Sequence, residues 1–283
     1  MQTVVITGAS TGIGRASARH LAQQGWRVFA GVRKQADADA LAADHANITP
    51  LILDVTDTAS LAAAVETVST ALESAKLAGL VNNAGIAQMG PLAVQPMDEI
   101  RSHFEVNLFG ALACSRAFIP LLGMDETRSG PPGRIINITS VGGKISAPFL
   151  GAYTATKHAL ESVTDTLRRE LMVYGIDAIA IGPGAVATPI WDKAETEGEL
   201  PYQDTAWAGP IAKFAAVMLK GGREGLPPEE IAKMVETALS DPSPKARYAP
   251  VPDKLTNFTI PSRLPKRWLD RIFAKRFGIA AKS

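Results

Sequence analysis

Short apolar runs alternate with longer amphipathic segments over the first 190 residues of the chain. The apolar runs have the character of strands in a parallel sheet and lie at Val4–Ile6, 27–34, Leu51–Leu53, 79–85 and 134–140. The amphipathic segments carry apolar residues at helical spacing and lie at Arg15–Gln24, Leu61–Leu72, Met97–Leu122 and Tyr153–Tyr174. Strands that alternate with helices in this way predict an α/β fold.

The remaining third of the chain is less regular. PPEEIAKMVETAL (227–239) predicts a helix with prolines at its start, and KARYAPV (245–251) predicts a last strand. We therefore expect one domain over residues 1–252, followed by a tail at 253–283. Within the tail, Pro265–Phe277 can form an amphipathic helix. Its apolar residues toward one side would be Trp268, Leu269, Ile272, Phe273 and Phe277.

Composition and charge narrow the function classes. The 283 residues include 29 Lys or Arg and 28 Asp or Glu, and the net charge of +1 gives no general case for nucleic-acid binding. The single cysteine, Cys114, cannot form an internal disulfide, which fits a reducing cytoplasm. We expect no signal peptide, and no apolar run of the roughly eighteen residues that a membrane-spanning helix needs. We expect a cytoplasmic protein, and we identify no metal-binding pattern.

A glycine-rich turn follows the first predicted strand. Gly8, Gly12 and Gly14 have the spacing GxxxGxG and stand between that strand and the helix at 15–24. Glycine permits a tight turn and lets the backbone approach a pyrophosphate at a helix N-terminus, where free N–H groups and the helix dipole favour anions. Thr11 can donate a further hydrogen bond. The turn therefore predicts a dinucleotide site.

The ends of the second and third strands indicate which dinucleotide binds. An acidic residue after the second strand would bind the ribose hydroxyls of NAD, whereas arginine accommodates the 2′-phosphate of NADP. Residues 31–34 contain no acid, and Arg33 offers a forked guanidinium beside the charge of Lys34. Asp54, after the third strand, can accept a hydrogen bond from the adenine amino group. We expect NADP, with NAD as the alternative.

Candidate proton-transfer chemistry lies in the helical stretch Gly151–Leu171. Tyr153 and Lys157 are four residues apart and share one helical face. A neighbouring ammonium favours the phenolate, and so lowers the phenol pKa from its usual value near ~10 toward the range where the group exchanges protons with a substrate. Ser140 ends a strand-like segment and can hold a substrate oxygen near Tyr153. Taken alone, such a tyrosine and lysine pair also occurs as ordinary packing.

Two polar sites elsewhere have both a structural and a functional interpretation. NNAG at 82–85 ends the fourth strand beside the expected crevice, either as an ordinary turn or as a set of cofactor contacts. Asn107 lies in an apolar helix interior, where an amide needs a partner. It either hydrogen-bonds a neighbouring strand or holds a water that relays protons from Lys157.

The motifs occur in order and at natural separations: TGASTGIG at 7–14, NNAG at 82–85, Asn107, Ser140, YxxxK at 153–157 and PG at 183–184. The chain resembles the single-domain short-chain dehydrogenase/reductase family, closely over about 1–190 and more loosely through 228–251. The resemblance implies a Rossmann-type, doubly wound parallel sheet and hydride transfer between nicotinamide C4 and a substrate carbon. A nucleotide-binding protein without turnover is the alternative, which the presence of all four catalytic residues disfavours.

By position, the resemblance assigns roles to these residues. Tyr153 would be the general acid/base, and Lys157 would lower its pKa and contact the nicotinamide ribose. Ser140 would orient the substrate oxygen, and Asn107 would hold the relay water. The expected cofactor contacts lie in the glycine turn, at the strand ends, in the catalytic pair and after PG: Gly8, Ser10, Thr11, Gly12, Ile13, Gly14, Arg33, Asp54, Val55, Asn82, Ala84, Gly85, Tyr153, Lys157, Pro183, Gly184, Val186 and Thr188.

The substrate side is less defined by motifs. The resemblance places a covering loop at about 188–226, where Trp191, Tyr202 and Trp207 either line an apolar pocket or pack ordinarily. We expect reversible oxidoreduction of a lipophilic alcohol, ketone or aldehyde.

The tail and the two long helices bear on partners. The basic tail, similar to those of retinol and hydroxysteroid dehydrogenases, would pack on the protein, cover a partner subunit or rest on an anionic membrane surface. Family members usually form dimers or tetramers through two long helices, here Met97–Leu122 and Tyr153–Tyr174. We therefore expect a homodimer or homotetramer.

Overall fold

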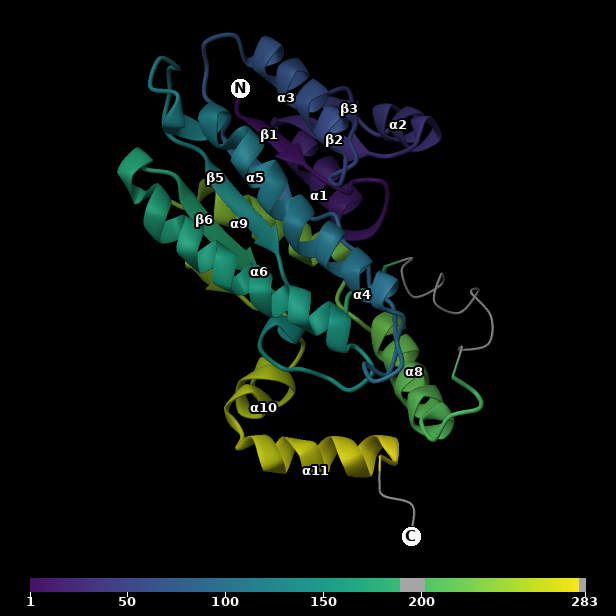
Figure 1. The fold of residues 1–283 in the computed structure, drawn as a ribbon. Coiled ribbons are helices and arrows are strands. Elements are labelled where there is room, and N and C mark those ends of the chain that lie inside the picture. The colour runs from purple at the N-terminus through teal and green to yellow at the C-terminus, as the bar shows by residue number, and fades with distance from the viewer. Residues whose placement is uncertain (189–201, 280–283) are drawn as a thin grey trace.

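The computed structural model describes residues 1–188 and 202–279, and its sheet has the strand order β3-β2-β1-β4-β5-β6-β7 (Figure 1). All six neighbouring pairs are parallel. The strands are β1 Thr3–Ile6, β2 Arg27–Val32, β3 Ile48–Ile52, β4 Gly79–Asn82, β5 Arg134–Ile138, β6 Asp177–Ile181 and β7 Arg247–Tyr248. The chain moves outward from β1 to β3, then returns to the other side of β1. This reversal makes the sheet doubly wound, as predicted, and doubly wound sheets bind ligands at the carboxyl edge where it occurs, here between β1 and β4.

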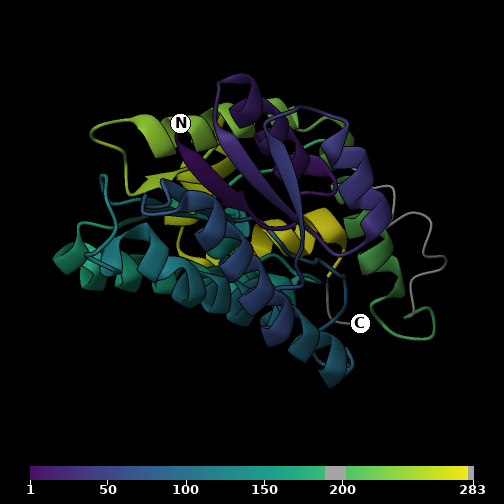
Figure 2. The same cartoon turned by 90° about the horizontal axis from the view of Figure 1, so that it is seen from above.

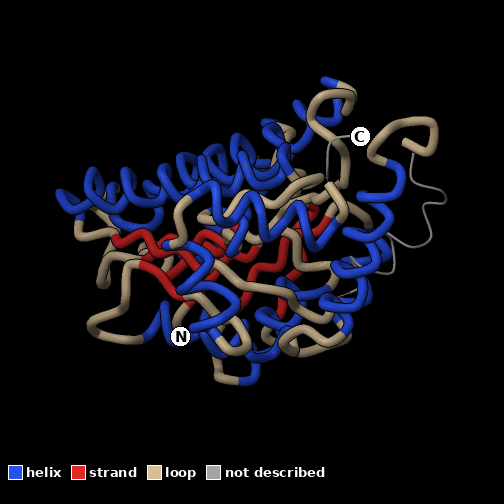
Figure 3. Tube along the Cα trace, turned by 90° about the horizontal axis from the view of Figure 1, so that it is seen from below, coloured by secondary structure: helices blue, strands red, loops and turns tan. Residues whose placement is uncertain are grey.

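Helices cover both faces of the sheet (Figures 2 and 3). One core contains residues of α1 (Gly12–Gln23), α2 (Gln35–Ala42) and α9 (Pro228–Ser240), and the other contains residues of α3 (Thr58–Leu72), α5 (Ala111–Ile119) and α6 (Gly151–Glu170). Val4 and Ile6 of β1 belong to the first core, whereas Val5 belongs to the second. Successive strand side chains point to opposite faces, so an unbroken apolar run is what a sheet covered on both sides requires.

The longest helical segment runs from Met97 to Met124. α4 (Met97–Phe104) continues through a π-helical turn at Glu105–Gly110 into α5, which ends in a second π-helical turn at Pro120–Met124. Within residues 1–188 and 202–279 it is the one helix long and apolar enough to cross a membrane by length and composition, so our expectation of no such run is wrong. More than half of its apolar window is buried inside the fold, as in a core helix.

Most of the other helices and strands lie close to the predicted positions, with several differences. α8 (Ala208–Arg223) is a helix within the stretch that was expected as a covering loop, and β6 was not predicted. α1 begins at Gly12, inside the glycine turn, rather than at Arg15. α2 was not predicted, because only Ala38 and Leu41 of this helix are buried, which is too few to give an apolar pattern at helical spacing. β7 contains just two residues. By contrast, Asp57 caps α3 by accepting hydrogen bonds from the N–H groups of Ala59 and Ser60, which adds to helix stability.

The C-terminal tail is helical and docks on the domain. After a π-helical turn at Leu255–Thr259 come α10 (Ile260–Arg263) and α11 (Lys266–Phe277), which lies beside α8 (Ala208–Arg223) in Figure 1. The ring of Phe277 packs edge-on against Phe214 of α8, with centroids 5.1 Å apart. Packing on the protein, one of the interpretations above, therefore holds for this face of the tail helix. The domain boundary at residue 252 stays a prediction.

The apolar residues of α11 do not all share one side, contrary to our expectation. Phe273 and Phe277 join the cluster around Phe214. Trp268 and Ile272 are exposed. The difference arises because 3.6 residues complete a helical turn, so residues nine positions apart face opposite directions. α11 therefore has a packed face and a second, solvent-facing apolar face.

Candidate active site

The glycine turn and the loop after β4 are joined by side-chain hydrogen bonds. Oγ1 of Thr7 accepts the backbone N–H groups of Asn83 and Ala84 at 3.0 and 3.1 Å. The Asn83 amide donates to the carbonyl oxygens of Thr7 and Gly8 at 3.0 and 2.8 Å. These bonds satisfy backbone groups at the ends of two parallel strands, so they hold the two loops in a defined relation at the point where the strand order reverses.

Two glycines of the same turn have little room for a side chain. Gly8 has a φ of +65°, and a Cβ there would lie 2.7 Å from Cα of Ala84. Gly12 has a φ of +56°, and its Cβ would lie 3.1 Å from Cγ2 of Thr188. Thr11 is the N-cap residue of α1, but its side chain makes no capping hydrogen bond. Its hydroxyl therefore does not occupy the N–H groups of the first helical turn. A bare helix start of this kind fits the phosphates of a dinucleotide.

Charged side chains stand at the carboxyl ends of β2 and β3. Arg33 follows β2 and is exposed. Asp54 follows β3, and its Oδ1 accepts hydrogen bonds from the N–H and the hydroxyl of Thr56 at 2.9 and 2.7 Å. These hydrogen bonds hold the pKa of Asp54 below its usual value, and the charge of Arg33 adds to the effect. The edge of the crevice thus carries an ionised acceptor and an exposed cation. Val55, the next residue, is buried.

Asn107 lies in the π-helical turn Glu105–Gly110 and is almost completely buried. Its Oδ1 accepts the N–H of Ile86 at 2.8 Å, and its Nδ2 donates to the carbonyl oxygen of Ile86 and to the hydroxyl of Thr156 at 2.9 and 3.2 Å. The structural interpretation is therefore observed, since the amide fixes the loop after β4. A Cβ on Gly85 would lie 3.2 Å from this Oδ1 and 3.7 Å from Nζ of Lys157.

Ser140 and Tyr153 come together from two elements. Ser140 follows β5, and Tyr153 lies in the first turn of α6. Their side chains are hydrogen-bonded to each other, and Oγ of Ser140 also accepts the N–H of Gly142 at 3.0 Å. Tyr153 is half-buried. The structure therefore forms the pair of hydroxyls that the sequence pointed to.

Lys157 lies one turn along α6 and is only 5% exposed. Its Nζ donates to the carbonyl oxygen of Ile138 at 2.9 Å and lies 5.7 Å from the centre of the Tyr153 ring. Burial lowers the pKa of Lys157 to about 8, because the ammonium loses its water. Burial also raises the pKa of Tyr153, although the hydrogen bond with Ser140 acts in the opposite direction. Our prediction of a lowered pKa for Tyr153 is wrong for this structure, because desolvation outweighs the other effects.

The segment after β6 ties the remaining loops together. Gly184 donates its N–H to the carbonyl oxygen of Pro250 at 3.0 Å, and the carbonyl oxygen of Pro183 accepts the N–H of Val141 at 2.9 Å. Val186 is buried. Thr188 then reaches the glycine turn at Gly12. The PG segment therefore connects the dinucleotide side of the crevice to the Ser140 loop.

The buried carboxylate of Glu161 stabilises the loop that carries Ser140. Glu161 of α6 accepts hydrogen bonds from Nε of Arg247 at 2.9 Å and from the hydroxyl of Thr139 at 2.6 Å. Nζ of Lys144 lies 3.1 Å from the same carboxylate. Arg247 also donates to the carbonyl oxygen of Ser140 at 3.3 Å. This network fixes the backbone that carries the Ser140 hydroxyl.

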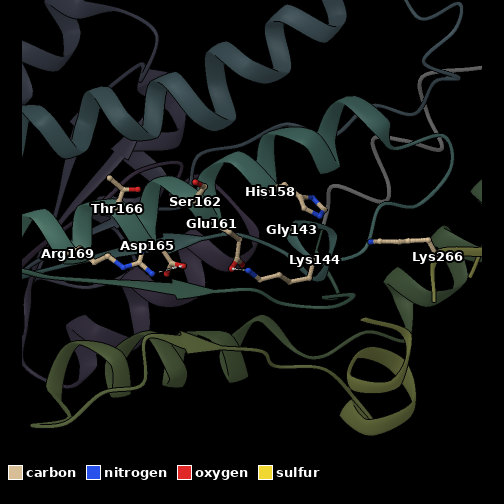
Figure 4. A pocket seen from close by; sticks show the side chains of 9 residues that line it. All are labelled: Gly143, Lys144, His158, Glu161, Ser162, Asp165, Thr166, Arg169 and Lys266. Carbon is tan, nitrogen blue, oxygen red and sulfur yellow. Dashed lines mark ion pairs between the residues drawn. The ribbon is translucent and has the colours of Figure 1, made fainter. Parts of the chain in front are cut away.

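A hollow of about 490 Å³ lies along the outer side of α6, between Lys144 and Lys266 (Figure 4). Ser162 is one of its lining residues, and its position nine residues after Tyr153 places it half a turn around the helix. The hollow is therefore separate from the crevice that contains Tyr153.

Most of the expected site residues gather at the carboxyl edge of the sheet, but Asn82 does not contribute its side chain. Its amide points into the core and donates to Ser115 and Asn137 at 2.9 and 2.8 Å. Sequence reasoning missed Thr7 and Asn83 as the residues that join the two loops, although both stand inside the motifs. The other expected contacts lie in the loops described: Ser10, Ile13, Gly14, Ala84 and Gly85. Among residues 1–188 and 202–279, no three His, Cys, Asp or Glu side chains form a metal site.

Comparisons with known proteins agree with this geometry. A sequence model of the short chain dehydrogenase family matches residues 2–199. The chain is 37% identical over 276 residues to the NADPH-dependent 3-dehydrocapnine reductase of Ornithobacterium rhinotracheale, which covers 97% of each chain. It is 31% identical to human retinol dehydrogenase 5, over 95% of this chain and 86% of that protein.

A solved structure shows the same fold. The chain matches a short-chain dehydrogenase/reductase from Burkholderia phymatum in complex with NAD, with a TM-score of 0.78 and 26% identity. The match covers 96% of this chain and 95% of that one.

Lys157→Met should stabilise the fold at neutral pH, because it removes a buried amine whose pKa is depressed. The ordinary pKa of lysine is 10.5, whereas the pKa of Lys157 in the folded protein is about 8. The penalty, about 3 kcal/mol at most, is therefore fully present below pH 8 and disappears as the pH rises toward 10.5. Urea unfolding at pH 7 and pH 10 measures this gain and its decrease.

Lys157→Arg serves as the control, since it keeps the charge and should show no such gain. A Lys157→Met protein that is no more stable than the unmodified protein at pH 7 would contradict the assigned burial penalty.

Proposed function

Because the chain belongs to the short-chain dehydrogenase/reductase family of oxidoreductases, we propose that it interconverts a lipophilic carbonyl and its alcohol with NADP(H). The observation that carries the proposal is the hydrogen-bonded pair of Ser140 and Tyr153 beside a buried Lys157. This group lies at the carboxyl edge of a doubly wound sheet, next to a glycine turn suited to a dinucleotide. The site thus combines a proton donor, an oxygen-binding hydroxyl and a cofactor crevice.

Proton transfer in the reducing direction would proceed through Tyr153. The Ser140 hydroxyl hydrogen-bonds the substrate oxygen and holds it beside the phenol. A nicotinamide cofactor, when bound, supplies hydride to the carbonyl carbon, and Tyr153 gives its proton to the oxygen, so that an alcohol results. The raised pKa of Tyr153 keeps the phenol protonated at neutral pH, which suits a proton donor.

Lys157 and Asn107 would return the proton to Tyr153. A lysine with a pKa of about 8 exchanges protons readily near neutral pH. Its Nζ and the Oδ1 of Asn107 approach the same point at Gly85, where a water held by both groups would connect the phenol with solvent. Asn107 thus combines the structural role that its hydrogen bonds show with the proposed relay role.

NADP is the proposed cofactor, and NAD is the alternative. The glycine turn would hold the phosphates, Asp54 the adenine amino group and Arg33 the 2′-phosphate. The relative from Ornithobacterium rhinotracheale is named as NADPH-dependent, which supports NADP. The Burkholderia phymatum structure contains NAD, which supports the alternative.

A lipophilic substrate fits the residues next to the catalytic pair. Phe149, four positions before Tyr153, belongs to an apolar cluster with Tyr202, Phe214 and the partly buried Trp207. An apolar cluster beside a polar reacting centre is the usual composition of a small-molecule site. Human retinol dehydrogenase 5, a relative, is named for an apolar alcohol. Trp191, the other aromatic residue expected here, lies outside the described residues.

The proposal includes a cytoplasmic homodimer or homotetramer. Large apolar side chains are exposed on the two long helical segments, among them Met97, Phe109, Met172 and Val173. A second copy of the chain would remove such side chains from water. Light scattering of the purified protein measures the mass of the assembly.

Tyr153→Phe should lower kcat by roughly 100-fold or more, because the variant lacks the proposed proton donor. Fluorescence titration should show NADPH binding largely unchanged. NADPH oxidation with a panel of aldehydes, ketones and steroids provides the measurement. Tyr174→Phe, in the 3₁₀ turn Leu171–Tyr174 that follows α6, is the matched control and should keep its turnover. Near-native turnover of the Tyr153 variant would end the assignment.

Arg33→Ala should weaken NADPH binding by about 10- to 100-fold, because a charge-assisted hydrogen bond to the 2′-phosphate is lost. NADH carries no such phosphate, so its affinity should change little. Titration of both cofactors measures the effect, with Arg19→Ala on the exposed side of α1 as the control. Equal losses for NADPH and NADH would refute the 2′-phosphate role.

A series of ketones of increasing chain length tests the lipophilic substrate. Each further buried methylene should raise kcat/KM, by up to about fourfold, until the apolar cluster is filled. Steady-state kinetics at saturating NADPH give the trend. A kcat/KM that is flat or falls with chain length would show that the apolar cluster is packing alone.

A further inference from the structure

Charge is distributed very unevenly between the tail and the rest of the chain. Residues 254–283 contain eight of the 29 Lys or Arg and one of the 28 Asp or Glu. The first 253 residues therefore hold 21 basic and 27 acidic residues, an excess of six negative charges, whereas the tail has an excess of seven positive charges. The one acid of the tail, Asp270, is paired with Arg267 at 3.5 Å. A near-neutral protein thus has one strongly basic region.

Within this region, the solvent-facing side of residues 255–276 combines cations with exposed apolar groups, and we call it the tail face. Leu255 is 64% exposed, Ile260 47%, Trp268 60% and Ile272 48%. These four residues lie within eighteen positions of one another in the sequence, and Trp268 and Ile272 are one turn apart on α11. Exposed apolar groups that form a patch generally mark an interaction surface.

The geometry of α11 separates this face from the packed one. Phe277 packs on Phe214, and nine residues before it Trp268 points in the opposite direction. Ile272 lies one turn after Trp268, and the exposed Arg271 and Lys275 flank it on the same side of the helix. In Figure 1, α11 is the outermost element below the body of the domain. On α11, the tail face is therefore turned away from the protein.

We propose that the tail face binds the surface of an anionic lipid bilayer. Lys and Arg side chains are attracted to anionic headgroups, tryptophan is favoured at the level of the headgroups, and isoleucine or leucine side chains reach the acyl boundary. A second copy of the chain is disfavoured as the occupant, because a symmetric contact would bring two strongly basic surfaces together. Both the charge and the apolar side chains are matched by a negatively charged membrane.

The docked face of α11 leads back toward the catalytic residues. Phe277 contacts Phe214, and Phe214 contacts Phe149 with ring centroids 5.7 Å apart. Phe149 lies four residues before Tyr153, so an apolar path extends from α11 to the catalytic helix. Binding through the tail face would place this path at the membrane, where a lipophilic substrate is dissolved. This consequence rests on the proposed function, but the membrane contact itself does not.

Vesicle sedimentation of the full-length protein tests the contact. Vesicles of phosphatidylcholine with phosphatidylglycerol should bind the protein, and vesicles of phosphatidylcholine alone should bind it much less. Arg271→Gln with Lys275→Gln should weaken binding by about 30-fold, at roughly fivefold for each charge. The matched control is Lys76→Gln with Lys245→Gln, which removes the same charge at the amino edge of the sheet, before β4 and β7, and should leave binding unchanged.

Trp268→Ala with Ile272→Ala tests the apolar contribution. This variant should bind the anionic vesicles less than the original protein does. The difference should persist at high salt, where the electrostatic attraction is screened. Circular dichroism and thermal unfolding check that each variant is folded. No binding by the original protein, equal binding by the charge variant, or a changed assembly mass in the apolar variant would overturn the proposal, the last because a second copy would then occupy the face.

Turnover distinguishes this inference from the proposed function. A protein that binds anionic vesicles but oxidises no NADPH with any carbonyl would contradict the enzymatic proposal and leave the membrane contact standing. A protein that turns over soluble ketones but does not bind vesicles would contradict the membrane contact and leave the enzymatic proposal standing.

Discussion

The proposed catalytic edge of this protein depends on the amine of Lys157, which is almost completely buried. Lys157 is buried with its Nζ held by the carbonyl oxygen of Ile138, and Tyr153 stands beside it. Burying an ammonium is unfavourable, so the depressed pKa of Lys157 represents free energy of folding that is not recovered locally. The surrounding sheet and helices must offset this loss. Desolvation of Tyr153 itself raises the pKa of its phenol, so the proposed reduction starts from a protonated phenol.

The rest of the site follows from the topology of the sheet. Parallel strands end at one edge, so loops that are far apart in the sequence meet there. Thr7 and Asn83 join the glycine turn to the loop after β4, and the PG segment joins that turn to the Ser140 loop. Glu161 and Arg247 then fix the Ser140 loop from the side of β7. The hydrogen bonds in these connections satisfy backbone and charged groups that would otherwise be unpaired.

The tail adds a second level of organisation. Its aromatic residues Phe273 and Phe277 continue the apolar cluster beside α6, whereas its exposed residues carry most of the positive charge of the tail. One short helix therefore both packs against the domain and presents cations to solvent. The division is possible because nine residues of helix reverse the direction of a side chain. Function at a lipid surface would use both faces at once.

The sequence by itself determined the α/β class, most of the order of strands and helices, and the residues of the proposed catalytic group, because apolar period, glycine spacing and the interval between Tyr153 and Lys157 are local properties. It did not predict α2, β6 or α8. Only the tertiary structure decided the direction of the Tyr153 pKa, the inward orientation of Asn82 and the network around Glu161. Desolvation and long-range hydrogen bonds depend on which segments meet in space, and residues as distant as 161 and 247 give no sign of their contact in the order of the chain. The split of α11 into two faces was decided in the same way, by where α8 lies.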